Sequence, residues 1–397
     1  MTASQHYLDT GGLSMLTWLF RRFPAVLAFA ALTLLAACGG GGSSGGGAIP
    51  PQPAQPVAPA TASPTASPTS VPTQAPAAET LAIVSQSMGE VALYPVGATQ
   101  PSTTIMAANL GQGQFQPTSI ALDAQNDLFI TDQQLDAVWE VPPPYLAPSI
   151  AAISQGLLEP IDVAVSKAGT LFIADVDINY VSGISQAVRM YQPPYSTETD
   201  LAIPANDEFA PFCLALDAQS NLFATSAAWS AGNSGTMEYA PPYNGSPASY
   251  AFGGNWGYAP TFAGGGCTLD PGSGELFVGY GSTIEAYAPP YNGAATVIAE
   301  GADGNATVAV SSANNDFFVA NGASVDVYAP PYTTKTSSIT MGVNNPNILA
   351  VDTSGNLFVG STSNGTITEY AAPYTGTPVW TLSAFGIVGS SALAVIP

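Results

Sequence analysis

The chain has 397 residues, with 5 Lys and Arg against 27 Asp and Glu, a formal net charge of −22, one histidine and three cysteines. Binding of nucleic acid or of anionic lipid headgroups requires clustered basic side chains, so the charge balance excludes both as electrostatic partners. Only 8% of the residues are charged, whereas 40 are Gly and 35 are Pro, and this composition argues against helical bundles and coiled coils.

Residues 1–38 have the pattern of an export signal. Arg21 and Arg22 precede an apolar run from Phe23 to Ala37, which is shorter than the ~20 apolar residues of a membrane-spanning helix. The run ends in Leu-Ala-Ala-Cys38, which resembles the lipobox of bacterial lipoproteins. The resemblance implies cleavage before Cys38, a lipid on Cys38 that holds the protein to a membrane, and location in the bacterial cell envelope, at the outer membrane or the cell surface.

Two start sites fit this signal, because Met15 and Met1 both precede the whole of it. The alternative to a lipobox is an ordinary signal helix with a buried cysteine. Removal of the signal takes away His6, the one histidine, and leaves Lys167, Arg189 and Lys335 as the basic side chains of the mature chain.

Residues 39–78 are predicted to be a disordered tether. The first nine residues are all Gly or Ser, and the stretch from 50 to 78 is rich in Pro, Ala, Thr and Ser. Gly/Ser runs behave as flexible coil and Pro-rich runs extend at ~3.1 Å per residue. Such a composition buries too little apolar surface to fold by itself.

From residue 79 the chain repeats a module of short strands. The second strand of each copy begins with two apolar residues, at Leu128, Leu171, Leu222, Leu276, Phe317 and Leu357, at steps of 43, 51, 54, 41 and 40 residues. Each copy closes on a tyrosine that follows proline: Tyr145, Tyr195, Tyr243, Tyr291, Tyr332 and Tyr374. Several short strands per unit at this period indicate the blades of a β-propeller.

The two ends of residues 79–397 hold complementary parts of a module. Residues 81–84 and 90–95 match the second and third strands, b and c, whereas residues 391–395 match the first strand, a. We therefore expect an all-β, seven-bladed propeller in which the N- and C-terminal strands share one blade. Closure of the ring hides sheet edges that would otherwise be exposed.

The stretches Leu216-Asp-Ala-Gln-Ser-Asn-Leu-Phe223 and Val351-Asp-Thr-Ser-Gly-Asn-Leu-Phe-Val359 resemble the NHL-type propeller repeat. This resemblance spans about residues 80–397 and implies the fold alone. NHL repeats commonly carry an Arg after strand b, and no copy in this chain has one.

The mature chain offers no obvious catalytic group. Without histidine there is no Ser-His-Asp or Cys-His arrangement and no imidazole ligand, so we expect a binding module in preference to an enzyme. Four strands a end in Asp123, Asp217, Asp270 and Asp352, and two others end in Ser166 and Ser311. We interpret these residues as turn caps; the alternative is a cation-binding acidic ring. Likewise, the Pro-Tyr corners are expected to pack against the next blade, and a tyrosine-lined binding face is the alternative.

Cys213 and Cys267 precede strand a in consecutive complete copies, and an exported protein meets oxidising conditions. A disulfide is one interpretation. The two cysteines are offset by one residue relative to the following Asp, which directs them to opposite sheet faces and favours two buried free thiols.

The candidate ligand-binding face is predicted from the unequal lengths of the connections between strands. The b–c and d–a connections of a propeller share one face, and the long insertions all fall in such connections of the second to fourth complete copies. Their Trp, Tyr, Asn and acidic side chains suit a protein, peptide or glycan partner. The candidates are Asp175, Asp177, Asn179, Tyr180, Asp207, Glu208, Trp229, Asn233, Asn255, Trp256 and Tyr258.

No cofactor is predicted. A calcium site is a weaker alternative at Asp175, Asp177 and Asn179, because side chains with oxygen ligands stand at every second position there. The Gly and Glu that an EF-hand loop needs are replaced by Tyr180 and Gln186. Two further roles stay open: a calcium-dependent hydrolase or lactonase-like enzyme on the same face, and a passive structural protein of the envelope.

Overall fold

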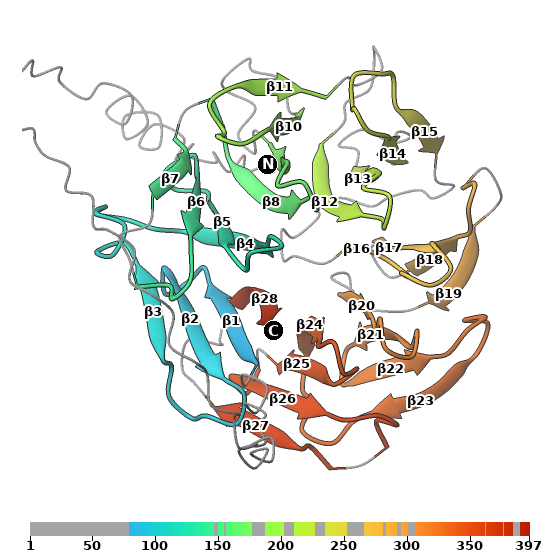
Figure 1. Ribbon diagram of the computed structural model, residues 1–397. Helices are drawn as coiled ribbons and strands as arrows, with labels where there is room; N and C mark the ends of the chain where they lie inside the picture. The colour runs from blue at the N-terminus through green and yellow to red at the C-terminus, as the bar shows by residue number, and fades with distance from the viewer. Residues whose placement is uncertain are drawn as a thin grey trace, which may run out of the picture. The chain divides into compact units, whose positions relative to one another are not determined.

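The computed structural model describes residues 79–146, 150–154, 156–176, 187–201, 210–226, 235–251, 266–280, 283–291, 295–300, 307–361, 363–375, 377–383 and 390–397. Within these ranges all regular structure is β, in seven four-stranded antiparallel sheets (Figure 1). Residues 1–78, with the predicted signal, Cys38 and tether, lie outside the described residues.

In each blade, strand a is the innermost, strands b and c follow, and strand d is the outermost. Blade 1 contains β28 (Ser390–Ile396), β1 (Thr80–Ser85), β2 (Glu90–Pro95) and β3 (Thr103–Met106). Blade 2 contains β4 (Pro117–Leu122), β5 (Leu128–Asp132), β6 (Ala137–Val141) and β7 (Ile150–Ile153). Blade 3 contains β8 (Pro160–Val165), β9 (Leu171–Asp175), β10 (Ala187–Tyr191) and β11 (Glu198–Asp200). Blade 4 contains β12 (Pro211–Leu216), β13 (Leu222–Ser226), β14 (Gly235–Tyr239) and β15 (Ala248–Ala251).

The remaining blades follow the same order. Blade 5 contains β16 (Cys267–Leu269), β17 (Leu276–Tyr280), β18 (Thr283–Tyr287) and β19 (Thr296–Glu300). Blade 6 contains β20 (Val308–Val310), β21 (Phe317–Asn321), β22 (Ser324–Tyr328) and β23 (Lys335–Ile339). Blade 7 contains β24 (Pro346–Val351), β25 (Leu357–Ser361), β26 (Thr366–Tyr370) and β27 (Trp380–Ser383).

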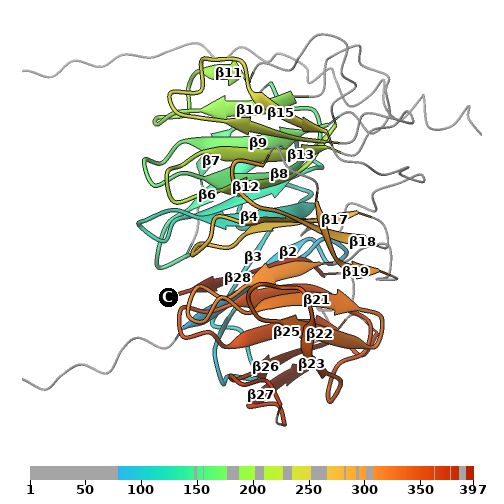
Figure 2. The ribbon, with the colours of Figure 1, turned by 90° about the vertical axis from the view of Figure 1, so that its right-hand side faces the viewer.

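The blades close into a ring through their innermost strands. Each strand a contacts the strand a of the next blade, from β4 through β8, β12, β16, β20 and β24 to β28, which contacts β4 (Figure 1). β28 pairs antiparallel with β1, with Val395 opposite Leu81 and Leu393 opposite Ile83. The seven-bladed propeller with a blade shared by the two terminal strands is therefore confirmed. Figure 2 shows the same sheets from the side, stacked face to face.

The core lies between neighbouring sheets. Strands b are buried along their whole length in blades 2, 3, 4 and 7, because both of their faces meet another blade. The strand c over residues 137–141 is buried except for Glu140. The reason is the same stacking, which leaves neither face of strand c to solvent.

The repeated Asp and Ser at the end of strand a cap the a–b turn. Asp217 Oδ1 accepts from the backbone N–H groups of Gln219 and Asn221 at 2.9 and 2.7 Å. Asp352 Oδ1 binds the N–H groups two and four residues on in the same way, at 2.9 and 2.7 Å. The carboxylates therefore serve the turns, as expected for side chains that bond backbone two residues ahead.

The Pro-Tyr corners tie each c–d turn to its own a–b turn and to a neighbouring blade. Tyr243, with φ of 64°, donates from its hydroxyl to the carbonyl of Ser220 at 2.7 Å, and its ring meets Phe172 edge-on at 4.9 Å. Tyr195 makes the same contacts, with Gly169 and Phe129. Phe129 and Phe172 belong to the preceding blade, so the expected packing against the next blade was wrong in direction. The cause is that the second residue of strand b in blades 2 and 3 faces the following blade.

Candidate functional site

The loop face is the end of the ring at which the b–c and d–a connections lie. Of the residues predicted to bind a ligand at this face, the structure describes Asp175, which lies at the end of β9. The other predicted residues lie outside the described residues: Asp177, Asn179, Tyr180, Asp207, Glu208, Trp229, Asn233, Asn255, Trp256 and Tyr258.

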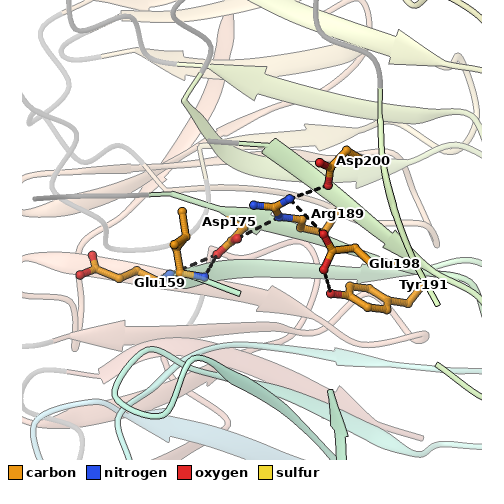
Figure 3. A network of polar contacts seen from close by, with 7 residues as sticks. Glu159, Asp175, Arg189, Tyr191, Glu198 and Asp200 are labelled. Carbon is orange, nitrogen blue, oxygen red and sulfur yellow. Dashed lines mark hydrogen bonds and ion pairs between the residues drawn. The ribbon is translucent and has the colours of Figure 1, made fainter. Parts of the chain in front are cut away.

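Asp175 is fully buried and forms an ion pair with Arg189 of β10 (Figure 3). Asp175 Oδ2 lies 3.0 Å from Arg189 Nε, and Asp175 Oδ1 accepts from the backbone N–H groups of Leu158 and Glu159 at 2.8 and 3.1 Å. Burial raises the pKa of Asp175 to about 6, against the lowering effect of these donors. Both carboxylate oxygens are thus occupied by the protein itself.

Arg189 also binds two carboxylates of the outer strand β11. Its Nη1 lies 3.1 Å from Glu198 Oε1 and 2.6 Å from Asp200 Oδ1, and Glu198 Oε2 accepts from the Tyr191 hydroxyl at 2.7 Å. Arg189 is buried, whereas Asp200 is about half exposed. Because the guanidinium is desolvated and opposed by three carboxylates, the cluster holds blade 3 together and leaves the Arg189 side chain inaccessible to solvent.

The position of Asp175 carries a buried polar side chain in other blades as well. Asp132 Oδ1, Ser226 Oγ and Ser361 Oγ each accept from a backbone N–H that precedes strand a of the same blade, those of Gln116, Ala210 and Asn344. The repetition indicates that this position fixes the d–a connection. Asp175 is therefore a structural residue, and the two further members of the calcium candidate, Asp177 and Asn179, lie outside the described residues.

A second repeated position links the inner strands of neighbouring blades. Ser119 of β4 donates to Asp162 Oδ1 at 2.7 Å, and Asp162 Oδ2 of β8 accepts from the backbone N–H of Leu214 at 2.8 Å. Cys213 occupies the corresponding place in β12, and Thr307 before β20 donates to the carbonyl of Asn347 in blade 7 at 2.6 Å. Sequence reasoning missed this series; the one signal for it was an Asp inside an apolar strand a.

Cys213 and Cys267 form a disulfide between blades 4 and 5. The interpretation as free thiols was wrong. Cys213 pairs with Thr225, and Cys267 pairs with Val278, which stands one place earlier in its own strand b. The two side chains do point to opposite faces of their sheets, but opposite faces of consecutive blades are the faces that meet. The offset of one residue therefore brings the cysteines together.

The described residues contain no group of three or more His, Cys, Asp and Glu side chains that could hold a metal ion. In the same part of the chain, no helix is long and apolar enough to span a membrane. The chemistry that the described loop-face groups can perform is hydrogen bonding and ion pairing within the blades.

No protein-family model matches the chain, and no curated protein matches it. Solved structures match it in fold. A functionally unknown protein from Desulfotomaculum acetoxidans has a TM-score of 0.57 and 13% identity, with 80% of this chain and 98% of that chain covered. A protein from Lactobacillus plantarum has a TM-score of 0.54 and 17% identity, with coverage of 80% and 99%. A catalytically inactive variant of Staphylococcus aureus virginiamycin B lyase, with a histidine replaced by alanine and with quinupristin, has a TM-score of 0.50 and 8% identity, with coverage of 66% and 83%.

Proposed function

We propose that the protein is a lipid-anchored, extracytoplasmic propeller whose loop face binds a protein, peptide or glycan. The observation that supports this most is topological. The long connections over residues 176–186, 201–210, 227–234 and 252–266 join strands b to c, or d to a, in blades 3, 4 and 5. The described strand ends that these connections join lie at the same end of the ring in three consecutive blades. The connections carry Trp229 and Trp256 together with Tyr, Asn and acidic residues.

Binding is favoured over catalysis by the side chains that are present. The matched lyase is described as inactive once a histidine is replaced, and the one histidine of this chain, His6, lies in the predicted signal. At the end of β9, the carboxylate oxygens of Asp175 already bind Arg189 and backbone N–H groups. A calcium-dependent hydrolase at Asp175, Asp177 and Asn179 would then have to rely on the latter two residues for free carboxylate or amide oxygens.

The test of binding uses the full-length protein at the surface of intact cells. Cross-linking followed by affinity capture is expected to recover a specific partner, and Trp229→Ala combined with Trp256→Ala is expected to abolish that recovery. Trp380→Ala, in β27 of blade 7, is the matched control and retains the partner. Equal recovery with all variants, or a fall in melting temperature that accounts for the loss, contradicts a ligand-binding loop face. Stabilisation by millimolar calcium that a chelator reverses would support the hydrolase instead.

Anchoring is tested separately. Metabolic labelling with a fatty-acid analogue is expected to label the wild type and to fail with Cys38→Ser, which is then released from the membrane fraction. Retention of Cys38→Ser in that fraction contradicts the lipid anchor. The disulfide between Cys213 and Cys267 supports export, because disulfides persist mainly in oxidising compartments.

A further inference from the structure

The methionines of the propeller fall into an exposed and a buried group. Met88, Met106 and Met341 are 52%, 41% and 57% exposed, whereas Met190 and Met237 are 7% and 4% exposed. Methionine is among the residue types that are most often fully buried, where its flexible side chain fills gaps in the core. Three of the five methionines of the propeller therefore do not serve this purpose.

The exposed methionines stand in or beside the connections that define the loop face. Met88 lies between β1 and β2 and Met341 between β23 and β24, and Met106 ends β3 before the connection to β4. In the part of the chain that the structure describes, none of the three belongs to a hydrophobic cluster. Backbone groups fix the chain at two of these positions: the Met106 N–H donates to Asn109 Oδ1 at 3.0 Å, and the Met341 carbonyl accepts from the Tyr370 hydroxyl. A chemical change at the sulfur therefore removes neither core packing nor these bonds.

The buried methionines belong to the core between blades 3 and 4. Met190 of β10 and Met237 of β14 pack in one hydrophobic cluster with Phe172 and Leu214. The Met237 sulfur also accepts from the Tyr239 hydroxyl at 3.3 Å. A sulfoxide would bring a polar oxygen into this cluster, so oxidation at either position requires the two blades to separate.

The exposed thioethers are the reduced sulfur that an oxidant can reach in the described part of the chain, because Cys213 and Cys267 are already joined in a disulfide. We propose that Met88, Met106 and Met341 form a reversible oxidation site, at which peroxides are reduced and methionine sulfoxide is formed while the fold stays intact. The inference goes beyond the proposed function, because this reaction needs no partner on the long connections.

The reaction balances in both directions. The thioether sulfur attacks one oxygen of the peroxide, so that an S–O bond forms and the O–O bond breaks. The second oxygen leaves as water or an alcohol after it takes up the proton of the first. Sulfur loses two electrons and the peroxide gains them. A dithiol-dependent methionine sulfoxide reductase restores the thioether: two thiols become a disulfide, and the sulfoxide oxygen leaves as water.

Peptide mapping by mass spectrometry of the full-length protein treated with hydrogen peroxide tests the site. Met88, Met106 and Met341 are expected to gain one oxygen about tenfold faster, or more, than Met190 and Met237. In guanidinium chloride all five are expected to react at similar rates, because unfolding removes the protection of the core. Equal rates at the five positions of the native protein would overturn the proposal.

A second set of measurements concerns the fold and the stoichiometry. Protein oxidised at the three exposed positions is expected to melt like the unoxidised protein and to recover its thioethers with methionine sulfoxide reductases and dithiothreitol. The triple variant Met88→Leu, Met106→Leu, Met341→Leu is expected to consume less peroxide, by one equivalent for each position replaced. Met190→Leu with Met237→Leu is the matched control and retains the rapid consumption of the wild type. A fall in melting temperature on oxidation, thioethers that the reductases do not restore, or equal consumption by the triple variant and the wild type would each contradict the site.

Discussion

At the residue scale, Asp162 couples the stability of the ring to pH. Burial raises its pKa from 3.8 to about 6, although Ser119, Leu214 and Val163 donate to it. Between these two values the folded protein binds a proton that the unfolded chain does not. The contribution of Asp162 to the free energy of unfolding therefore increases as the pH falls from 7 to 4, and it decreases as the pH rises through the folded pKa.

The predicted gain from this carboxyl is on the order of 2 kcal/mol across that range. Urea denaturation at closely spaced pH values measures it. Asp162→Asn is expected to keep the acceptor for Ser119 and to flatten the pH dependence. Part of the remainder comes from Asp175, whose pKa is also raised to about 6, and from other carboxyls whose pKa burial raises, such as Asp132 and Glu369. Asp123→Asn is expected to retain the wild-type profile. A pH dependence that is identical in Asp162→Asn and the wild type contradicts the assignment.

Tyr243 allows the hydroxyl and the ring of a Pro-Tyr corner to be separated. Tyr243→Phe removes the hydrogen bond to the Ser220 carbonyl but retains the edge-on contact with Phe172. We expect a loss of about 1 kcal/mol in the free energy of unfolding. Phe172→Ala leaves a cavity at a fully buried position and is expected to lose about 3–5 kcal/mol. Chemical denaturation measures both losses. A larger loss for Tyr243→Phe than for Phe172→Ala would show that the hydroxyl stabilises the corner more than the ring contact does.

At the scale of elements, the disulfide between Cys213 and Cys267 links the inner strands of blades 4 and 5 covalently. Cys213 and Cys267 are 54 residues apart, so the bond constrains a long loop of the unfolded chain. The double variant Cys213→Ser, Cys267→Ser is expected to lose about 2–5 kcal/mol. Reduction of the wild type should match the double variant, and reduction of the double variant should change nothing. Reactive thiols at both positions in the unreduced, denatured protein would contradict the bond.

The blades could be predicted from the sequence because each strand repeats local chemistry at a nearly fixed period. Leu128, Leu171 and their counterparts mark strands b, and the Pro-Tyr corners mark the c–d turns, without any knowledge of distant partners. The cysteine pair and the contact of Asp162 with Leu214 could not be predicted in this way. They depend on which sheet face meets which neighbour, and bulges after Pro160 and Pro211 shift that register. The carboxylate oxygens of Asp175 indicated a ligand site. The residue that binds them, Arg189, lies on another strand, so the local sequence around Asp175 does not show the ion pair.

At the scale of the whole molecule, stability depends on the contact between the two ends of residues 79–397. Leu81 and Ile83 of β1, which are 0% and 2% exposed, pack in one cluster with side chains of β28 and of blade 7. β28 also supplies the inner strand that contacts β4 and β24. Each fully buried Leu or Ile contributes about 1.5–3 kcal/mol relative to exposure. Loss of β28 would open one side of this cluster and expose the edge of β1, in a domain whose total stability is expected to be about 5–15 kcal/mol.

Deletion of residues 390–397 is therefore expected to give a chain that aggregates or binds a hydrophobic dye, whereas Pro397→Ala, at an exposed position, melts like the wild type. Because β28 joins blade 1 by backbone pairing along its length, a synthetic peptide of residues 390–397 added during refolding should restore part of the cooperative unfolding transition. A scrambled peptide should not, since the residues facing Leu81 and Ile83 would change. Circular dichroism and size-exclusion chromatography measure the outcome. A truncated protein that stays monomeric with an unchanged melting temperature would show that the remaining six blades hold their arrangement without closure.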